Sequence, residues 1–185
     1  MVGWVLRTFR RRSKTIMMIL WKSMIQSRLD YCSQLWSPQD QTSISKLEGV
    51  NRMEGLDYWE RLAKLGMYSQ ERRRERYQII FIWKLSQGLV QGYNLPFQQN
   101  ERRGLLVTVP PMAANSPSTV MKAREASLQV KGARLFNLIP RDLRDTNTGT
   151  VDHFKFRLDN WLATVPDQPT IQGRQRAAST NSLLD

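Results

Sequence analysis

The fold of this chain is decided by one stretch of its sequence, SQERRRERYQIIFIWKLSQG, at residues 69–88. Ser69 is a residue type that caps helix N-termini, and glycine, here Gly88, is typical of the position just beyond a helix end. Between them, Tyr77, Ile80 and Leu85 recur at helical spacing, and the apolar residues at 79, 82 and 83 widen the same face. We therefore expect a long helix that is buried against at least two neighbours.

The rest of the sequence predicts a mainly α protein in three parts. Residues 1–90 are expected to form a helical bundle. Residues 91–118 contain four prolines and are expected to form an irregular loop or linker, in which the apolar run Leu105–Val109 can form a strand. Residues 119–165 predict a smaller C-terminal helical unit, whose last helix runs from about Thr150 to Leu162. The polar segment 166–185 is expected to be a disordered tail.

Composition and charge limit the classes of partner that the chain can be expected to bind. The chain has 185 residues with 28 Lys+Arg and 16 Asp+Glu, a formal net charge of +12. Such a surplus indicates a polyanionic partner, with RNA or DNA first and an acidic membrane surface second. The longest apolar run, residues 16–21, is followed by Lys22 and is far shorter than the about 20 residues that a transmembrane helix needs. No transmembrane segment is predicted.

The sequence contains no recognisable catalytic constellation. The single Cys32 excludes an internal disulfide and a cysteine-based zinc site, and the single His153 excludes a multi-histidine metal site. The aspartates are never adjacent, whereas two-metal phosphoryl transfer needs carboxylates close together. Neither standard glycine-rich phosphate loop is present. We predict no catalytic residue, metal site or cofactor, and we do not expect the chain to be an enzyme on its own.

Two arginine-rich clusters are the positive signal for function. The first lies in the acid-free start of the chain, and the second covers the first two turns of the long helix. Guanidinium groups fit phosphate bidentately, so both clusters are candidate contacts for nucleic acid. The candidate residues are Arg7, Arg10, Arg11, Arg12 and Lys14 in the first cluster and Arg72, Arg73, Arg74 and Arg76 in the second. The alternative for the second cluster is a solvated face on which Glu71 and Glu75 pair with nearby arginines.

Three stretches of sequence, in a fixed order, carry a family resemblance. They are LDYCSQLWSP at residues 29–38, YWERL, ERRRERY and IWK within residues 58–84, and FNLIP at residues 136–140 followed by Phe154, Lys155 and Leu158. In this order they resemble the region downstream of the palm in LINE-type (non-LTR, jockey-like) retrotransposon reverse transcriptases. The resemblance covers nearly the whole chain.

The resemblance implies the thumb and C-terminal segment of such an enzyme. In the family, this mostly helical region helps to hold the template–primer duplex beside the palm. The family's catalytic aromatic-Ala-Asp-Asp motif has no match here, and the region around residues 50–57 is shorter than in the family. The implied function is non-catalytic binding of RNA or an RNA–DNA duplex, with the palm of a full-length reverse transcriptase as a further partner.

Two other interpretations remain open at the level of sequence. The first is a transposon-derived relic, translated from a truncated element, with no selected function. The second rests on the acid-free, arginine-rich start, which resembles a mitochondrial presequence or a membrane-surface helix. The expected location is inside the cell, in the cytoplasm or the nucleus, with the mitochondrion as the alternative.

Overall fold

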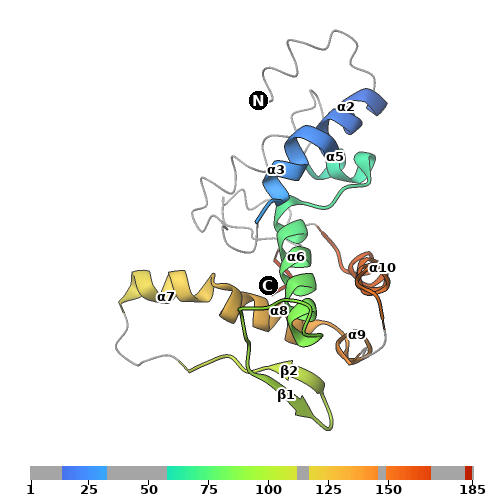
Figure 1. The fold of residues 1–185 in the computed structure, drawn as a ribbon. Coiled ribbons are helices and arrows are strands. Elements are labelled where there is room, and N and C mark those ends of the chain that lie inside the picture. The colour runs from blue at the N-terminus through green and yellow to red at the C-terminus, as the bar shows by residue number, and fades with distance from the viewer. Residues whose placement is uncertain (1–13, 33–57, 112–116, 146–148, 168–181, 185) are drawn as a thin grey trace.

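The chain folds as a mainly α protein, which confirms the predicted fold class. The computed structural model describes residues 14–32, 58–111, 117–145, 149–167 and 182–184 (Figure 1). Their helices are α2 (Lys14–Leu20), η1 (Trp21–Gln26), α3 (Ser27–Asp30), α5 (Tyr58–Leu65), α6 (Gln70–Ser86), α7 (Ser118–Glu125), η2 (Leu128–Gly132), α8 (Ala133–Leu138), α9 (Arg141–Arg144) and α10 (Val151–Leu162), where η marks a π-helix. The strands in this part of the chain are β1 (Phe97–Asn100) and β2 (Gly104–Val107).

The elements α2, η1 and α3 follow one another without a break and form one continuous N-terminal helix. Leu20, Gln26 and Ser27, at the junctions between these elements, all have right-handed helical backbone angles. The Ser23 and Ser27 hydroxyls each donate a hydrogen bond to the carbonyl oxygen four residues earlier, as serines inside helices often do. The N-terminal helix therefore continues without a break from Lys14, the first described residue, to Asp30.

Helix α6 has the limits that the sequence predicts. The Ser69 hydroxyl accepts a hydrogen bond from the backbone N–H of Arg72 at 3.1 Å, which caps the first turn. At the other end, Gly88 has φ of +68°, a left-handed conformation that costs glycine little, and its N–H donates to the carbonyl of Leu85. Local sequence signals thus set both ends of α6.

The hydrophobic core surrounds the apolar half of α6. Trp83 is fully buried and stacks on Phe154 of α10, with ring centroids 4.5 Å apart. Helix α8 packs on another side of α6, where Phe136 is buried and meets the edge of Phe97 from β1. The expectation that α6 is buried against at least two neighbours is confirmed.

A β-hairpin occupies part of the segment that the sequence predicts to be an irregular loop. Strands β1 and β2 are antiparallel, with Phe97 opposite Val107 and Asn100 opposite Gly104. The side-chain amide of Asn137 satisfies the outer edge of β2, accepting from the N–H of Val107 and donating to its carbonyl, both at 2.9 Å. The apolar run does form a strand, and β1 is the partner that the sequence did not predict.

The three parts expected from the sequence share one core. Its buried members come from α6, from Leu95 and Val107 in and beside the hairpin, and from α8, α9 and α10. Leu95 and Val107 of this segment are buried in the shared core, 7 % and 2 % exposed, whereas the turn and most of β1 are exposed. Strand β2 is buried because it packs against α8. No local feature of residues 91–118 predicts this packing.

Both described ends of the expected tail contact α6. The Asp167 carboxylate accepts from the N–H of Ser69 at 2.6 Å and from its hydroxyl at 2.9 Å. Farther along, Ser182 and the N–H of Leu183 donate to the two carboxylate oxygens of Glu75. Described residues at both ends of the predicted tail therefore contact α6 or its cap, while residues 168–181 lie outside the described part of the chain.

Candidate nucleic-acid interface

The first predicted contact cluster falls largely outside the structure. Arg7, Arg10, Arg11 and Arg12 precede the first described residue. Lys14 begins α2, and its side chain is not described. The assignment of these residues to phosphate contacts therefore stays a prediction.

In the second cluster, Arg72 and Arg74 point into the protein. Arg72 is 2 % exposed, donates from Nη2 to the carbonyl of Pro166 at 2.8 Å, and has Nε 3.6 Å from the carboxylate of Asp167. Arg74 is 6 % exposed. Neither guanidinium can reach a phosphate in this conformation, so the predicted contact role does not hold for these two residues.

Arg73 is bound to the end of the N-terminal helix. Its guanidinium forms a two-pronged ion pair with Asp30 of α3. The Tyr77 hydroxyl donates to the same carboxylate at 3.3 Å. The Asp30 side chain is only 13 % exposed, so its charge is neutralised inside the fold.

Arg76 is bound to α10 in the same manner. Its Nε and Nη2 donate to the two carboxylate oxygens of Asp159 at 2.5 and 2.7 Å, and this hydrogen bonding raises the pKa of Arg76. The Tyr68 hydroxyl donates to the carbonyl of Asp159 at 3.4 Å. Burial, followed by the charge of Asp159, raises the pKa of this phenol, so Tyr68 stays a neutral donor.

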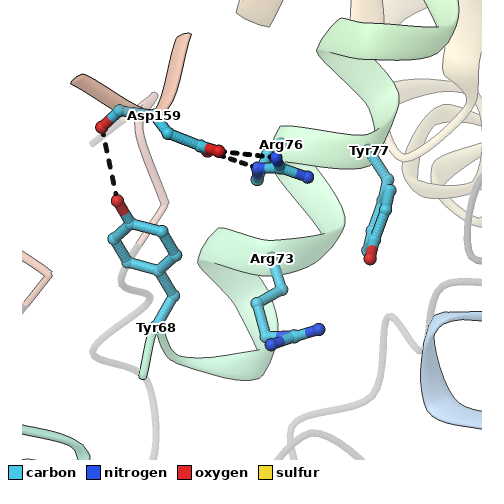
Figure 2. Close-up of a pocket in the computed structure, with 5 residues that line it drawn as sticks. All are labelled: Tyr68, Arg73, Arg76, Tyr77 and Asp159. Atoms are coloured by element: carbon cyan, nitrogen blue, oxygen red, sulfur yellow. Dashed lines mark hydrogen bonds and ion pairs between the residues drawn. The ribbon is translucent and has the colours of Figure 1, made fainter. Parts of the chain in front are cut away.

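Beside these contacts lies an open pocket of about 250 Å³ lined by Tyr68, Arg73, Arg76, Tyr77 and Asp159 (Figure 2). Figure 2 shows Arg73 and Arg76 on one side of α6, with Asp159 facing Arg76 from α10. Each arginine already has its own carboxylate, so a phosphate entering this pocket would have to compete with Asp159 and Asp30. The arginines at 72, 73 and 76 thus tie α6 to three distant segments.

Glu71 and Glu75 also have a basic neighbour from outside α6. Glu71 and Glu75 face Lys131 of η2, with the nearest N–O distances 3.6 and 3.3 Å. Arg72, Arg73 and Arg76 pair with Asp167, Asp30 and Asp159 respectively. These pairs join residues far apart along the chain, and helical i+3 and i+4 spacing carries no information about them.

The exposed cations lie elsewhere on the described surface. Two are on the N-terminal helix, two are in the turn of the hairpin, and α5, α7, α8 and α9 carry one each. They are Lys22, Arg28, Lys64, Arg102, Arg103, Lys122, Arg134 and Arg141. Nothing in the sequence marks Arg102 and Arg103 as a site, because two consecutive arginines are common. Only the fold places them together on the turn of the hairpin.

Comparison of the chain with protein-family models, curated proteins and solved structures gave no match. Among the described residues, no group of three or more histidine, cysteine, aspartate or glutamate side chains could hold a metal ion. No helix in that same part of the chain combines the length and the apolar character needed to cross a membrane.

Proposed function

We propose that the chain binds RNA or an RNA–DNA duplex through the phosphates, without catalysis, as the thumb-like and C-terminal part of a LINE-type reverse transcriptase. The palm of a full-length enzyme is the protein partner that this role implies. One observation carries the proposal: the N-terminal helix exposes cations, while its acid is neutralised internally.

Asp30 is the first acidic residue of the chain, and Asp40 is the next one. Its ion pair with Arg73 and its bond from Tyr77 remove its charge from the surface. Lys22 and Arg28 of the same helix are exposed. The helix therefore offers positive charge with little local compensation, which favours a polyanion.

We expect the double variant K22Q/R28Q to weaken binding to a labelled RNA–DNA duplex and to lower its salt dependence. Each lost phosphate contact should reduce the slope of log association constant against log salt by about 1. The measurement is fluorescence anisotropy at salt concentrations from about 50 to 200 mM, the range over which several phosphate contacts change affinity by orders of magnitude.

The matched control is K122Q/R134Q, which removes the same charge from exposed positions on α7 and α8. Equal slopes for the two double variants would show that only net charge matters and would remove the N-terminal helix as a contact. Failure of the folded wild-type chain to bind duplex at low salt would contradict the proposed function.

A second candidate, binding to an anionic membrane surface, is favoured by the apolar exposure of the same helix. Ile19 is 61 % exposed one turn before Lys22, a combination typical of helices that lie on lipid headgroups. Sedimentation with phosphatidylserine vesicles and with neutral phosphatidylcholine vesicles tests it. Binding to the anionic vesicles and not to the duplex would favour this candidate, and the absence of both activities is the result expected of a relic.

A further inference from the structure

We propose that the turn of the β-hairpin is a second phosphate-contact site for nucleic acid, with Arg102 and Arg103 as the contact residues. This inference rests on the proposed function and adds a site that the sequence did not indicate. The hairpin and the N-terminal helix lie toward opposite ends of α6, so the two sites are separate (Figure 1).

The backbone of the turn is held in one conformation. The Asn100 side-chain oxygen accepts from the N–H groups of Arg102 and Arg103 at 3.0 and 2.9 Å. The Asp145 carboxylate accepts from the N–H of Leu105 at 2.7 Å. Gly104 has φ of +75°, and a Cβ there would collide with the Asp145 carboxylate, so this close approach requires glycine.

Two arginines at α9 hold the carbonyl groups of the same turn. Arg141 Nη1 donates to the carbonyl of Glu101 at 3.1 Å, and Arg144 Nη2 donates to the carbonyl of Arg103 at 2.8 Å. A rigid backbone lowers the total conformational entropy that is lost when a ligand binds, because only the side-chain rotamers remain to be ordered. The turn is therefore a pre-organised base for Arg102 and Arg103.

The guanidinium groups of Arg102 and Arg103 are the groups that this turn offers to a partner. Both residues are exposed, and within the described residues neither guanidinium takes part in a hydrogen bond or ion pair. Arginine is the side chain best suited to phosphate, since its planar fork can donate two parallel hydrogen bonds to two phosphate oxygens.

The electrostatic surroundings favour an incoming anion. Arg144 is 6 % exposed, and its Nε and Nη1 have no hydrogen-bond partner in the described part of the chain. Burial lowers the pKa of Arg144, and the charges of Arg103 and Arg141 lower it further, against the opposing charge of Asp145. Asp145 is already engaged by Arg141 at 2.9 Å. Glu101 and Asp142 are the other acids of these two segments, so residues 100–105 and 141–145 together carry four arginines against three acids.

A phosphate near the turn would relieve the mutual repulsion of these arginines. Arg141 and Arg144 act as positioning residues, because they hold the carbonyls of the turn, while Arg102 and Arg103 make the contacts. We expect R102Q/R103Q to reduce the slope of log association constant against log salt for the RNA–DNA duplex by about 1 per lost contact. R102K/R103K should keep the wild-type slope, because the slope counts charges.

The control is again K122Q/R134Q, with circular dichroism confirming that each variant is folded. If the wild type binds and R102Q/R103Q has the same slope as the control, the hairpin site is overturned while the proposed function stands. If R102K/R103K loses as much slope as R102Q/R103Q, the turn acts through its structure, which also overturns the site. Absence of wild-type binding at low salt overturns both proposals together.

Discussion

Replacing Phe154 with alanine is expected to destabilise the fold by about 3–5 kcal/mol. Phe154 is 2 % exposed and stacks on the fully buried Trp83 with an interplanar angle of 8°. Truncation removes the ring and leaves a cavity between α6 and α10 that the rigid core can fill only in part. Urea unfolding followed by circular dichroism measures the loss, which is a large fraction of the stability of an ordinary domain.

The same helix supplies the control. Phe156, two residues farther along α10, is 64 % exposed, so Phe156→Ala should change the free energy of unfolding by no more than about 0.5 kcal/mol. Similar losses for the two variants would contradict the packing of α10 on α6, because that packing distinguishes the two phenylalanines.

Replacing Lys131 with methionine is expected to destabilise the protein by about 3 kcal/mol at neutral pH, as loss of one partner leaves a buried charge uncompensated. The carboxylate of Glu75 is almost fully buried, and the Lys131 ammonium lies 3.3 Å from it. The hydrogen bonds from Ser182 and Leu183 remain in the variant and limit the loss. Thermal or urea unfolding at neutral pH measures the change.

The effect of Lys131→Met should depend on pH. Burial raises the pKa of Glu75, with Lys131 the largest opposing influence. The folded state therefore binds this proton more tightly than the unfolded chain, so ionised Glu75 costs stability above its raised pKa, and the cost disappears as the pH falls through that pKa toward the ordinary value. Because losing Lys131 raises the pKa further, the difference between wild type and variant should shrink on acidification.

Two further variants make this test specific. Lys155 pairs with Asp152 on the exposed side of α10, so Lys155→Met should cost less than about 1 kcal/mol. Adding Glu75→Gln to Lys131→Met removes the unpaired charge and should recover part of the lost stability at neutral pH. A loss for Lys131→Met that is unchanged from neutral to acidic pH would show that Glu75 is not its cause.

Helices were the most predictable part of this protein, because their signals are local. The serine cap, the apolar spacing and the closing glycine of α6 all lie within residues 69–88. Helix α10 is similar: Thr150 caps it by accepting from the N–H of His153 at 3.3 Å, and Phe154 and Leu158 share its buried face. Such signals depend on neighbours three or four residues apart, which the sequence displays directly.

The hairpin was only half predictable. The apolar run in β2 indicates a strand, whereas β1 has the sequence FQQN with one apolar residue and three exposed polar ones. Strand β1 forms because β2 offers a backbone partner and because Phe97 packs against Phe136. Both causes lie outside β1, so no pattern within residues 97–100 could predict that this segment forms a strand.

The candidate site was the least predictable, because a charge in a sequence carries no information about its partner. The run of arginines at positions 72, 73, 74 and 76 has the composition of a phosphate-binding face, yet two of them are buried and two are engaged by Asp30 and Asp159. Conversely, the sequence does not mark Arg102 and Arg103 as candidate contacts, although the structure exposes them on a turn that is held by hydrogen bonds.

The sequence by itself determined the mainly α class, the limits of α6 and α10, and the net positive charge of the chain. The tertiary structure alone decided that the hairpin joins the core, that α6 is tied by its arginines to three distant aspartates, and which cations remain exposed. The physical reason is range: capping and helical periodicity act within a few residues, whereas ion pairing and burial join groups that only the folded chain brings together.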